Sequence, residues 1–133
     1  MRGALAATPD LPIGVGFADL AGYTATAARL ETDELADLVA RWDAEAFDAV
    51  SAHGGRVVKT IGDEVMFVGL PDRALQVALA LRDLGRDGGG LLPVRVGVAA
   101  GPVVGHAGDV FGPVVNLAHR LTELAEPGTV LAP

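Results

Sequence analysis

The sequence predicts an α+β domain with a ferredoxin-like βαββαβ core, in which helices pack on a mainly antiparallel sheet. Two observations lead to this fold class. Short β-prone apolar segments alternate along the chain with longer segments whose apolar residues recur at helical spacing. In addition, residues 56–69 form two apolar runs joined only at Gly62 and Asp63, which is typical of a tight β-hairpin.

The composition supports one folded domain and restricts its partners. The chain has 133 residues, half of them hydrophobic, which is sufficient for a buried core. With 10 Lys and Arg against 17 Asp and Glu, its formal net charge is −7, which argues against a nucleic-acid partner or an anionic membrane surface. A phosphorylated small molecule is compatible with this charge, because metal ions escort it into an acidic site. The absence of cysteine excludes disulfides, thiolate zinc sites and cysteine nucleophiles.

The sequence has no segment with the properties of a targeting or membrane-spanning element. Residues 1–10 lack the long apolar segment of a signal peptide. The most apolar stretch, residues 91–105, is interrupted by proline, arginine and glycine and is too short to cross a bilayer. We therefore expect a soluble, cytoplasmic protein without a membrane segment in this chain.

The first half of the chain is expected to contain a strand, two helices and the hairpin. The strand lies at about residues 13–19, and a turn then leads into helical sequence. Thr32 is a suitable cap for a longer helix, with Asp33 and Glu34 at the positive end of its dipole. A Gly-Gly pair ends this helix, whose apolar face consists of Leu35, Leu38, Val39, Trp42, Ala46, Ala49 and Val50.

The second half is expected to contain two further helices and two strands. A helix over about residues 71–84 is followed by a strand at about 92–100. The glycine-rich residues 101–112 are expected to form turns and short strand. Proline starts the next helix, at about 113–125, and a last strand lies at 129–131. The apolar stripe of the last helix is predicted to be Val114, Leu117, Ala118, Leu121 and Leu124.

Two aspartates at the ends of predicted strands are candidate metal ligands. Asp19 ends the first strand, and Asp63 lies at the tip of the hairpin. Two hard oxygen ligands on neighbouring strands are suited to Mg²⁺ or Mn²⁺. Close to Asp19, a turn with Gly22 and Thr24 exposes backbone N–H groups that suit phosphate oxygens. The alternative for each aspartate is an ordinary cap or turn residue.

Two further pairs of residues have side chains that suit a nucleotide. Lys59 interrupts an apolar strand and Asp109 lies in a glycine-flanked turn, so a donor and an acceptor together fit the edge of a purine. A lysine at a sheet edge and a simple turn aspartate are the alternatives. Asn116 and Arg120 are four apart and share one helix face, where an amide and a guanidinium suit a sugar and a phosphoryl group. A solvated surface pair is the alternative there.

Other motif classes give no candidate. His53, His106 and His119 have no recognisable metal-ligand spacing, and we assign them no role. The sequence contains neither a Gly-x-Ser-x-Gly motif nor a Walker-type phosphate loop. The aspartates and the two polar pairs therefore carry the functional interpretation.

Together these segments resemble the catalytic domain of class III adenylate and guanylate cyclases, in the form found in bacterial adenylate cyclases. Residues 17–24 are similar to the family's first metal motif, residues 53–63 to its second and residues 109–120 to its third. The resemblance covers residues 13–133, so residues 1–12 are expected to be an N-terminal extension. Three motifs in the family's order make it specific.

The resemblance implies how metal and phosphate are bound. Asp19 and Asp63 would hold two Mg²⁺ or Mn²⁺ ions per site, with help from the backbone carbonyl of Leu20. The turn after Leu20 would bind the β- and γ-phosphates of the substrate through Ala21, Gly22, Tyr23 and Thr24.

The resemblance also implies the substrate and the reaction. Lys59 and Asp109 match the pair that recognises adenine, where guanylate cyclases typically carry Glu and Cys. Asn116 would position the ribose, and Arg120 would stabilise the transition state. The ribose 3′-hydroxyl of ATP then attacks the α-phosphate, which gives 3′,5′-cyclic AMP, a signalling nucleotide, and pyrophosphate. A water or Asp19 is the candidate general base.

The family's sites form between two subunits arranged head to tail. The aspartates, Lys59 and Asp109 would come from one chain, and Asn116 and Arg120 from the other. Because one chain carries all six side chains, a homodimer would have two complete sites.

Two features distinguish the sequence from many relatives. The segment between Val104 and Asp109 is short, as in some bacterial cyclases, whereas many relatives have a longer β-arm there. Family members usually continue beyond residues 126–131 with a strand pair and a basic phosphate-binding residue. We therefore expect a domain that lacks the usual C-terminal strands.

Other functions are compatible with the same fold. A guanylate cyclase is disfavoured by Lys59 and Asp109. A non-catalytic module for nucleotide binding or dimerisation is opposed by the complete set of six residues. A regulatory α+β domain unrelated to nucleotides is the third alternative.

Overall fold

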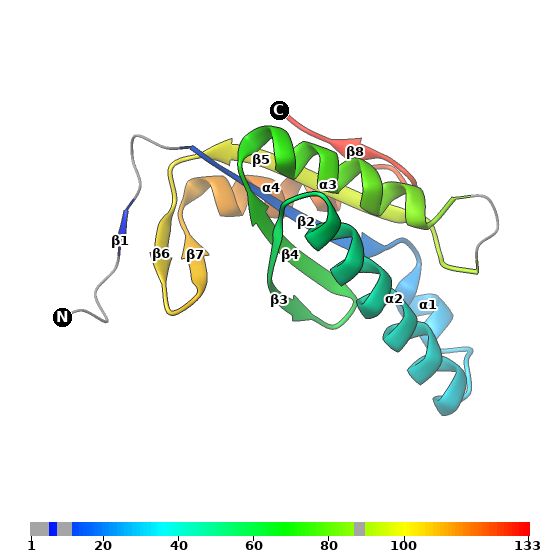
Figure 1. Ribbon diagram of the computed structural model, residues 1–133. Coiled ribbons are helices and arrows are strands. Elements are labelled where there is room, and N and C mark those ends of the chain that lie inside the picture. The colour runs from blue at the N-terminus through cyan, green and yellow to red at the C-terminus, as the bar shows by residue number, and fades with distance from the viewer. Residues whose placement is uncertain (1–5, 8–11, 87–89) are drawn as a thin grey trace.

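The computed structural model describes residues 6–7, 12–86 and 90–133 (Figure 1). Its main feature is a five-stranded sheet in the order β3-β4-β2-β5-β8. The strands are β2 (Ile13–Leu20), β3 (Arg56–Ile61), β4 (Glu64–Gly69), β5 (Val94–Gly101) and β8 (Val130–Leu131). Neighbouring strands are antiparallel except for β5 and β8, which are parallel.

The helices cover both faces of this sheet. In Figure 1, α2 (Thr32–Ala52) and α3 (Pro71–Leu84) lie on the front face, and α4 (Pro113–Leu124) lies behind it. The short helix α1 (Tyr23–Ala27) follows β2 directly. Taken along the chain, β2, the α1–α2 pair, β3, β4, α3 and β5 form a βαββαβ unit, which confirms the predicted α+β, ferredoxin-like core.

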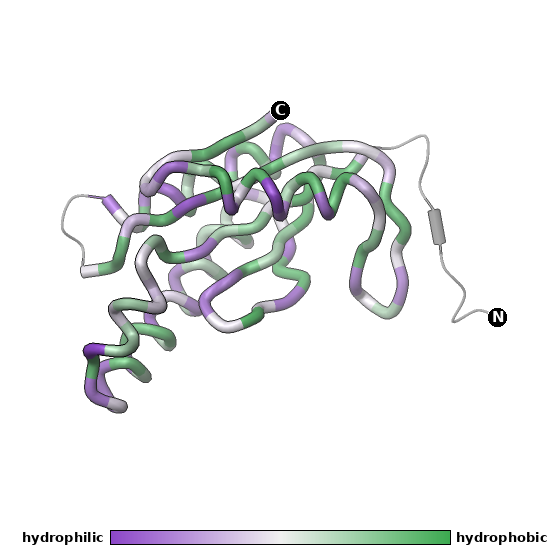
Figure 2. The backbone as a smooth tube through the Cα atoms, turned by 180° about the vertical axis from the view of Figure 1, so that it is seen from behind, coloured by the Kyte–Doolittle hydropathy of each residue, from purple (hydrophilic) through white to green (hydrophobic). Residues whose placement is uncertain are grey.

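The core has two parts because successive side chains of a strand point to opposite faces. On the α2–α3 face, Ala18 and Leu20 of β2 pack with Trp42 of α2. On the α4 face, Val15 and Phe17 pack with α4. Hydrophobic residues accordingly run along the strands in the centre of Figure 2, whereas hydrophilic residues recur along the helices. β2 is buried on both sides, and this rigid central strand ends at Asp19 and Leu20.

A second, small sheet lies beside the main one. It contains β1 (Ala6–Ala7), β6 (Val104–His106) and β7 (Asp109–Phe111), in the order β1-β6-β7. The short strands of the glycine-rich segment were predicted as such. Residues 1–5 and 8–11 of the expected N-terminal extension lie outside the described residues. In the described part of the chain, no helix is both long and apolar enough to cross a membrane.

The start of α2 differs from the prediction. Glu31, not Thr32, is the cap residue, with an extended backbone at φ −68° and ψ 159°. The backbone N–H of Glu31 donates to the Glu34 carboxylate at 3.0 Å, and the Glu31 side chain caps the first turn in return. This reciprocal capping box satisfies two groups that a Thr32 cap would leave open, so the helix begins one residue earlier than the threonine cap implies.

The packed face of α4 agrees with the prediction in part. Val114, Ala118 and Leu121 pack against the sheet as predicted. Leu117 and Leu124 are instead 41% and 66% exposed, and Thr122, which was not predicted, is fully buried. The reason is the close approach of α4 to β5 at Gly97, where the Cβ atom of any larger residue would lie 2.2 Å from the Thr122 backbone nitrogen. A helix that approaches a strand so closely presents small residues at the point of contact, and Leu117 and Leu124 remain exposed.

Candidate functional site

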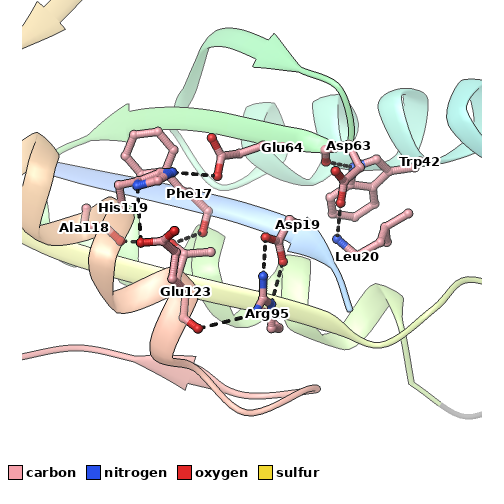
Figure 3. Close-up of polar contacts among 11 residues, drawn as sticks. Phe17, Asp19, Leu20, Trp42, Asp63, Glu64, Arg95, Ala118, His119 and Glu123 are labelled. Carbon is pink, nitrogen blue, oxygen red and sulfur yellow. Dashed lines mark hydrogen bonds and ion pairs between the residues drawn. The ribbon is translucent and has the colours of Figure 1, made fainter. Parts of the chain in front are cut away.

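The structure brings Asp19 and Asp63 to one end of the central sheet. β2 and β4 pair antiparallel with Ala18 opposite Val65, so the end of β2 lies beside the turn that precedes β4. The Leu20 backbone N–H donates to the Asp63 carboxylate at 3.0 Å (Figure 3). The two strands are therefore neighbours, which the sequence permits but does not establish.

Trp42 holds the backbone of the same turn. Its indole N–H donates to the carbonyl oxygen of Asp63 at 2.6 Å, and its ring is fully buried in the α2–α3 core. Gly62 precedes Asp63 with φ at +59°, in the left-handed region that glycine adopts without strain. A core residue thus fixes the backbone of the turn, and the Asp63 carboxylate is directed at the end of β2.

Arg95 is a member of this site that the sequence analysis missed. It lies on β5 directly opposite Asp19, and its guanidinium donates two hydrogen bonds to the Asp19 carboxylate, at 2.9 and 2.7 Å (Figure 3). This two-pronged contact raises the pKa of Arg95. The available signal was a single arginine within the otherwise apolar run of β5, but its partner depends on strand register.

The electrostatics of the aspartate pair favour a bound cation. Burial raises the pKa of the Asp63 carboxyl above its ordinary value, the bond from Leu20 opposes this, and the nearby charge of Asp19 raises it further. Folding therefore buries the charged Asp63 carboxylate beside Asp19 at a cost, which a cation bound there would reduce. No cluster of three or more His, Cys, Asp or Glu side chains suited to a metal occurs within residues 6–7, 12–86 and 90–133. The donor set is two hard carboxylates plus backbone oxygen, which fits Mg²⁺ or Mn²⁺.

A cavity of about 350 Å³ opens beside the two aspartates, and the turn after β2 forms its far wall. The lining residues are Asp19, Leu20, Gly22, Tyr23, Thr24, Ala25, Asp63 and Arg95. Three of the four predicted phosphate-binding residues thus reach this cavity. Ala21 does not line it, and its backbone N–H already donates to the carbonyl oxygen of Pro93 at 2.7 Å.

Lys59 and Asp109 lie together, although fifty residues separate them in the chain. The Lys59 ammonium donates to the Asp109 carboxylate at 2.8 Å, and this bond lowers the pKa of Asp109. Asp109 also accepts the backbone N–H of Val110 at 2.8 Å, while Arg56 donates to the Gly108 carbonyl oxygen at 3.3 Å. β3 is therefore attached twice to the turn between β6 and β7, and the donor and acceptor are fixed side by side.

Asn116 and Arg120 line a different cavity, of about 590 Å³, along α4. The other lining residues are Phe17, Val115, Leu117, His119 and Glu123. None of these residues lines the aspartate cavity. Within one chain, the described structure thus separates the candidate residues into two cavities, with the carboxylates in one and the amide and guanidinium in the other.

Comparison with known proteins identifies the family. Residues 5–132 match the family model described as the adenylate and guanylate cyclase catalytic domain. An adenylate cyclase of Glutamicibacter nicotianae is 49% identical over 120 residues, which is 88% of this chain and 29% of that protein. An adenylate cyclase of Streptomyces coelicolor is 43% identical over 123 residues, which is 92% of this chain and 32% of that protein. This chain therefore spans roughly a third of the length of these curated relatives.

Solved structures agree in fold. The adenylyl cyclase CyaB from P. aeruginosa has a TM-score of 0.75 and 27% identity, with 97% of this chain and 78% of that chain covered. The catalytic core of a rhodopsin-guanylyl cyclase with converted specificity, in complex with ATPαS, has a TM-score of 0.87 at 24% identity, with 97% and 79% covered. The second likeness shows the fold alone. Because the family model matches almost the entire chain, the chain belongs to the adenylate and guanylate cyclase catalytic domain family.

Proposed function

We propose that this chain is an adenylate cyclase domain, which converts ATP to 3′,5′-cyclic AMP and pyrophosphate. The observation that carries the proposal is the meeting of Asp19, Asp63 and Arg95 at one cavity beside the turn after β2. Relatives that bear the name adenylate cyclase at 43–49% identity support this choice of activity. A cluster of this kind combines metal ligands with a cation that suits a triphosphate.

Asp19 and Asp63, with the carbonyl of Leu20, would hold the two Mg²⁺ or Mn²⁺ ions. When bound, such ions lower the pKa of an attacking hydroxyl and neutralise triphosphate charge. The turn at Gly22, Tyr23 and Thr24 would hold the β- and γ-phosphates, since these residues line the cavity. Arg95, already aligned by Asp19, adds a positive charge at the same cavity.

The choice of ATP rests on Lys59 and Asp109. An ammonium donates hydrogen bonds and a carboxylate accepts them, which matches the N1 acceptor and the N6 amino donor on the edge of adenine. Their 2.8 Å contact keeps the two groups side by side before substrate arrives. On binding, the base would take over part of this hydrogen bonding.

Asn116 and Arg120 would act on the ribose and on the reacting phosphate. The 3′-oxygen forms a bond to the α-phosphorus, the bond to the pyrophosphate oxygen breaks, and the guanidinium stabilises the developing negative charge. In one chain these two residues lie in a cavity separate from the aspartates. This separation supports a head-to-tail homodimer in which each site takes the aspartates from one chain and α4 from the other.

The first test is turnover by the purified protein with ATP or GTP and Mn²⁺. We expect cyclic AMP from ATP, and little cyclic GMP from GTP. Asp63→Ala and Arg120→Ala are each expected to abolish turnover while leaving a folded dimer. Nucleotide binding without turnover by the folded wild-type dimer would instead favour the non-catalytic module.

The second test mixes the two inactive variants. Equal amounts of Asp63→Ala and Arg120→Ala chains should regain about a quarter of wild-type activity, since half of the dimers are mixed and each has one whole site. Mixing Asp63→Ala with Asp19→Ala serves as the control. Both aspartates of a site come from the same chain, so neither site of this mixed dimer is whole. No recovery in the first mixture, with both variants dimeric, would contradict a shared site.

A further inference from the structure

His119 is the residue through which α4 meets both strands that carry the aspartates. Its Nε2 lies 3.3 Å from the carboxylate of Glu64, the residue next to Asp63 (Figure 3). Its ring packs edge-on against Phe17, two residues before Asp19, with centroids 5.2 Å apart and planes at 83°. One imidazole on the α4 side therefore touches β4 and β2 at the positions that flank the proposed metal site.

The same residue lies between the two functional residues of α4. His119 directly precedes Arg120 and comes three residues after Asn116, and all three side chains line one cavity. Glu123, one helical turn further on, has its carboxylate 3.8 Å from the other ring nitrogen of His119. The imidazole thus lies between two carboxylates, of which Glu64 is nearer and less exposed, at 19% against 64%.

Three polar contacts attach α4 to three different strands of the sheet. The Thr122 hydroxyl contacts the Phe17 carbonyl oxygen of β2 at 3.1 Å, and Arg95 of β5 donates to the Glu123 carbonyl oxygen at 3.4 Å. His119 adds the contact to β4, on the side of the helix that lines the cavity with Asn116 and Arg120. Without the contact to β4, this side of the helix is held less firmly, and a roll of about 10° moves a side-chain end about 1 Å at the radius of a helix.

We infer that His119 is a positioning residue, which holds α4 against Glu64 and Phe17 and so aligns Asn116 and Arg120 with the site that they complete. This inference rests on the proposed function. Since a displacement of about 1 Å at a reacting group costs up to about a hundredfold in rate, loss of a half-exposed contact is expected to cost roughly tenfold. The loss falls on kcat, because His119 does not line the cavity beside the aspartates.

A mixed dimer with one working site provides the test. One chain carries Asp63→Ala and supplies Arg120, and its partner carries Arg120→Ala and supplies Asp63. His119→Ala in the chain that supplies Arg120 should lower kcat roughly tenfold and change KM for ATP less than about twofold. The same substitution in the chain that supplies Asp63 should leave kcat within about twofold. The inference would be overturned by equal losses of kcat from both chains, by a loss only from the chain that supplies Asp63, or by no loss from either chain.

Glu64 is tested in the same dimer without interference from the metal site. In the chain that supplies Arg120, Asp63 is already replaced, so Glu64→Ala there reports only on α4. It should reproduce the His119→Ala loss, and the two changes together should cost no more than one alone. Losses that multiply would overturn the contact as the cause. His119→Gln, whose amide N–H reaches towards Glu64, should recover most of the activity, and no recovery would count against the inference.

The control is a side-chain contact of similar exposure elsewhere on the chain. Arg41 pairs with Glu45 on α2 and is 43% exposed, close to the 45% of His119. Arg41→Ala in the chain that supplies Arg120 should leave kcat unchanged, and a matching loss would show a general effect of surface charge instead. Circular dichroism and size-exclusion chromatography confirm folded dimers. If the mixed dimer that retains His119 in both chains has no activity, the proposed function and this inference fail together. If that dimer is active but the two placements of His119→Ala give the same kcat, this inference alone fails.

Discussion

The indole N–H of Trp42 donates a hydrogen bond to the backbone carbonyl oxygen of Asp63 at 2.6 Å. A fully buried core residue on α2 therefore fixes the turn that presents the carboxylate proposed to bind metal. The link joins folding and function, because the packing that stabilises α2 also determines where the Asp63 side chain points. It also gives two experiments that do not depend on enzyme activity.

Trp42→Phe should weaken the fold measurably. Phenylalanine keeps an aromatic ring at this buried position but leaves the Asp63 carbonyl oxygen without its donor, which should lower the free energy of unfolding by roughly 1–3 kcal/mol. Urea denaturation followed by circular dichroism measures the change. Tyr23→Phe, which trims a hydroxyl from another aromatic packed against the same core, is the control and should stay within about 0.5 kcal/mol. Equal stability of Trp42→Phe and wild type would contradict the structural role.

Trp42 should also report metal binding by fluorescence. It is the only tryptophan of the chain and is bonded to the backbone of a proposed metal ligand. Paramagnetic Mn²⁺ is expected to quench its emission, and excess Mg²⁺ to reverse the quenching by competition. Asp63→Asn should weaken the quenching strongly, because one of two carboxylate ligands is lost. Identical Mn²⁺ titrations for the variant and the wild type would argue against a metal at Asp63.

The Asp63 carboxylate should cost stability in the metal-free protein at neutral pH. Its pKa is raised above 3.8 in the folded chain, first by burial and further by the charge of Asp19. The folded chain thus binds this proton more tightly than the unfolded chain, so stability falls as the pH rises past 3.8 and through the raised pKa. Asp63→Asn removes that cost while keeping an acceptor for the Leu20 N–H.

We therefore expect Asp63→Asn to be more stable than wild type at neutral pH in the presence of EDTA, with a difference that shrinks as the pH approaches 3.8. Urea denaturation across this range measures it. Asp48→Asn, at an exposed position of α2, is the control and should change stability by less than about 0.5 kcal/mol. If the variant were less stable than wild type at neutral pH, the charged Asp63 carboxylate would stabilise the fold, which contradicts the prediction.

Arg95→Lys should lower stability although the charge is conserved. Lysine cannot reproduce the two parallel hydrogen bonds to Asp19, which are only partly exposed to solvent. We expect the free energy of unfolding to fall by roughly 1–2 kcal/mol, as measured by urea denaturation. Arg82→Lys is the matched control, because Arg82 bonds the exposed carboxylate of its neighbour Asp83 and should contribute almost nothing. Equal effects of the two substitutions would show that the fork geometry at Asp19 is unimportant.

Lys59 and Asp109 should determine which purine is used. Lys59→Glu combined with Asp109→Cys, the residues typical of guanylate cyclases, should shift the ratio of kcat/KM for ATP over GTP by at least about tenfold towards GTP. Lys59→Glu alone should be more damaging than the double change, because it places two carboxylates side by side where an ion pair of 2.8 Å stood. Rates of cyclic AMP and cyclic GMP formation measure both effects. An unchanged ratio in a folded double variant would remove this pair from base recognition.

Much of the fold could be predicted from the sequence because its signals are local. The Gly62–Asp63 turn predicts its hairpin, and Pro71 predicts the start of α3, from chemistry within a few residues. The predicted cap residue of α2 was wrong. Thr32 is a good cap in isolation, but Glu31 and Glu34 form a capping box in which each side chain bonds the backbone of the other. The packed face of α4 was predicted only in part, because Gly97, at another place in the chain, sets how closely the helix approaches the sheet.

The candidate site divides in the same way. Residue types and spacing alone identified Asp19, Asp63, the purine-edge pair and the polar pair on α4 as candidates for nucleotide chemistry. Only the tertiary structure decided that Arg95 faces Asp19, that Trp42 fixes the Asp63 turn and that the aspartates and the polar pair on α4 line separate cavities. The physical reason is range: periodicity and turn chemistry depend on neighbours along the chain. Strand register, helix approach and side-chain partners are set by the packing of segments that are distant in sequence.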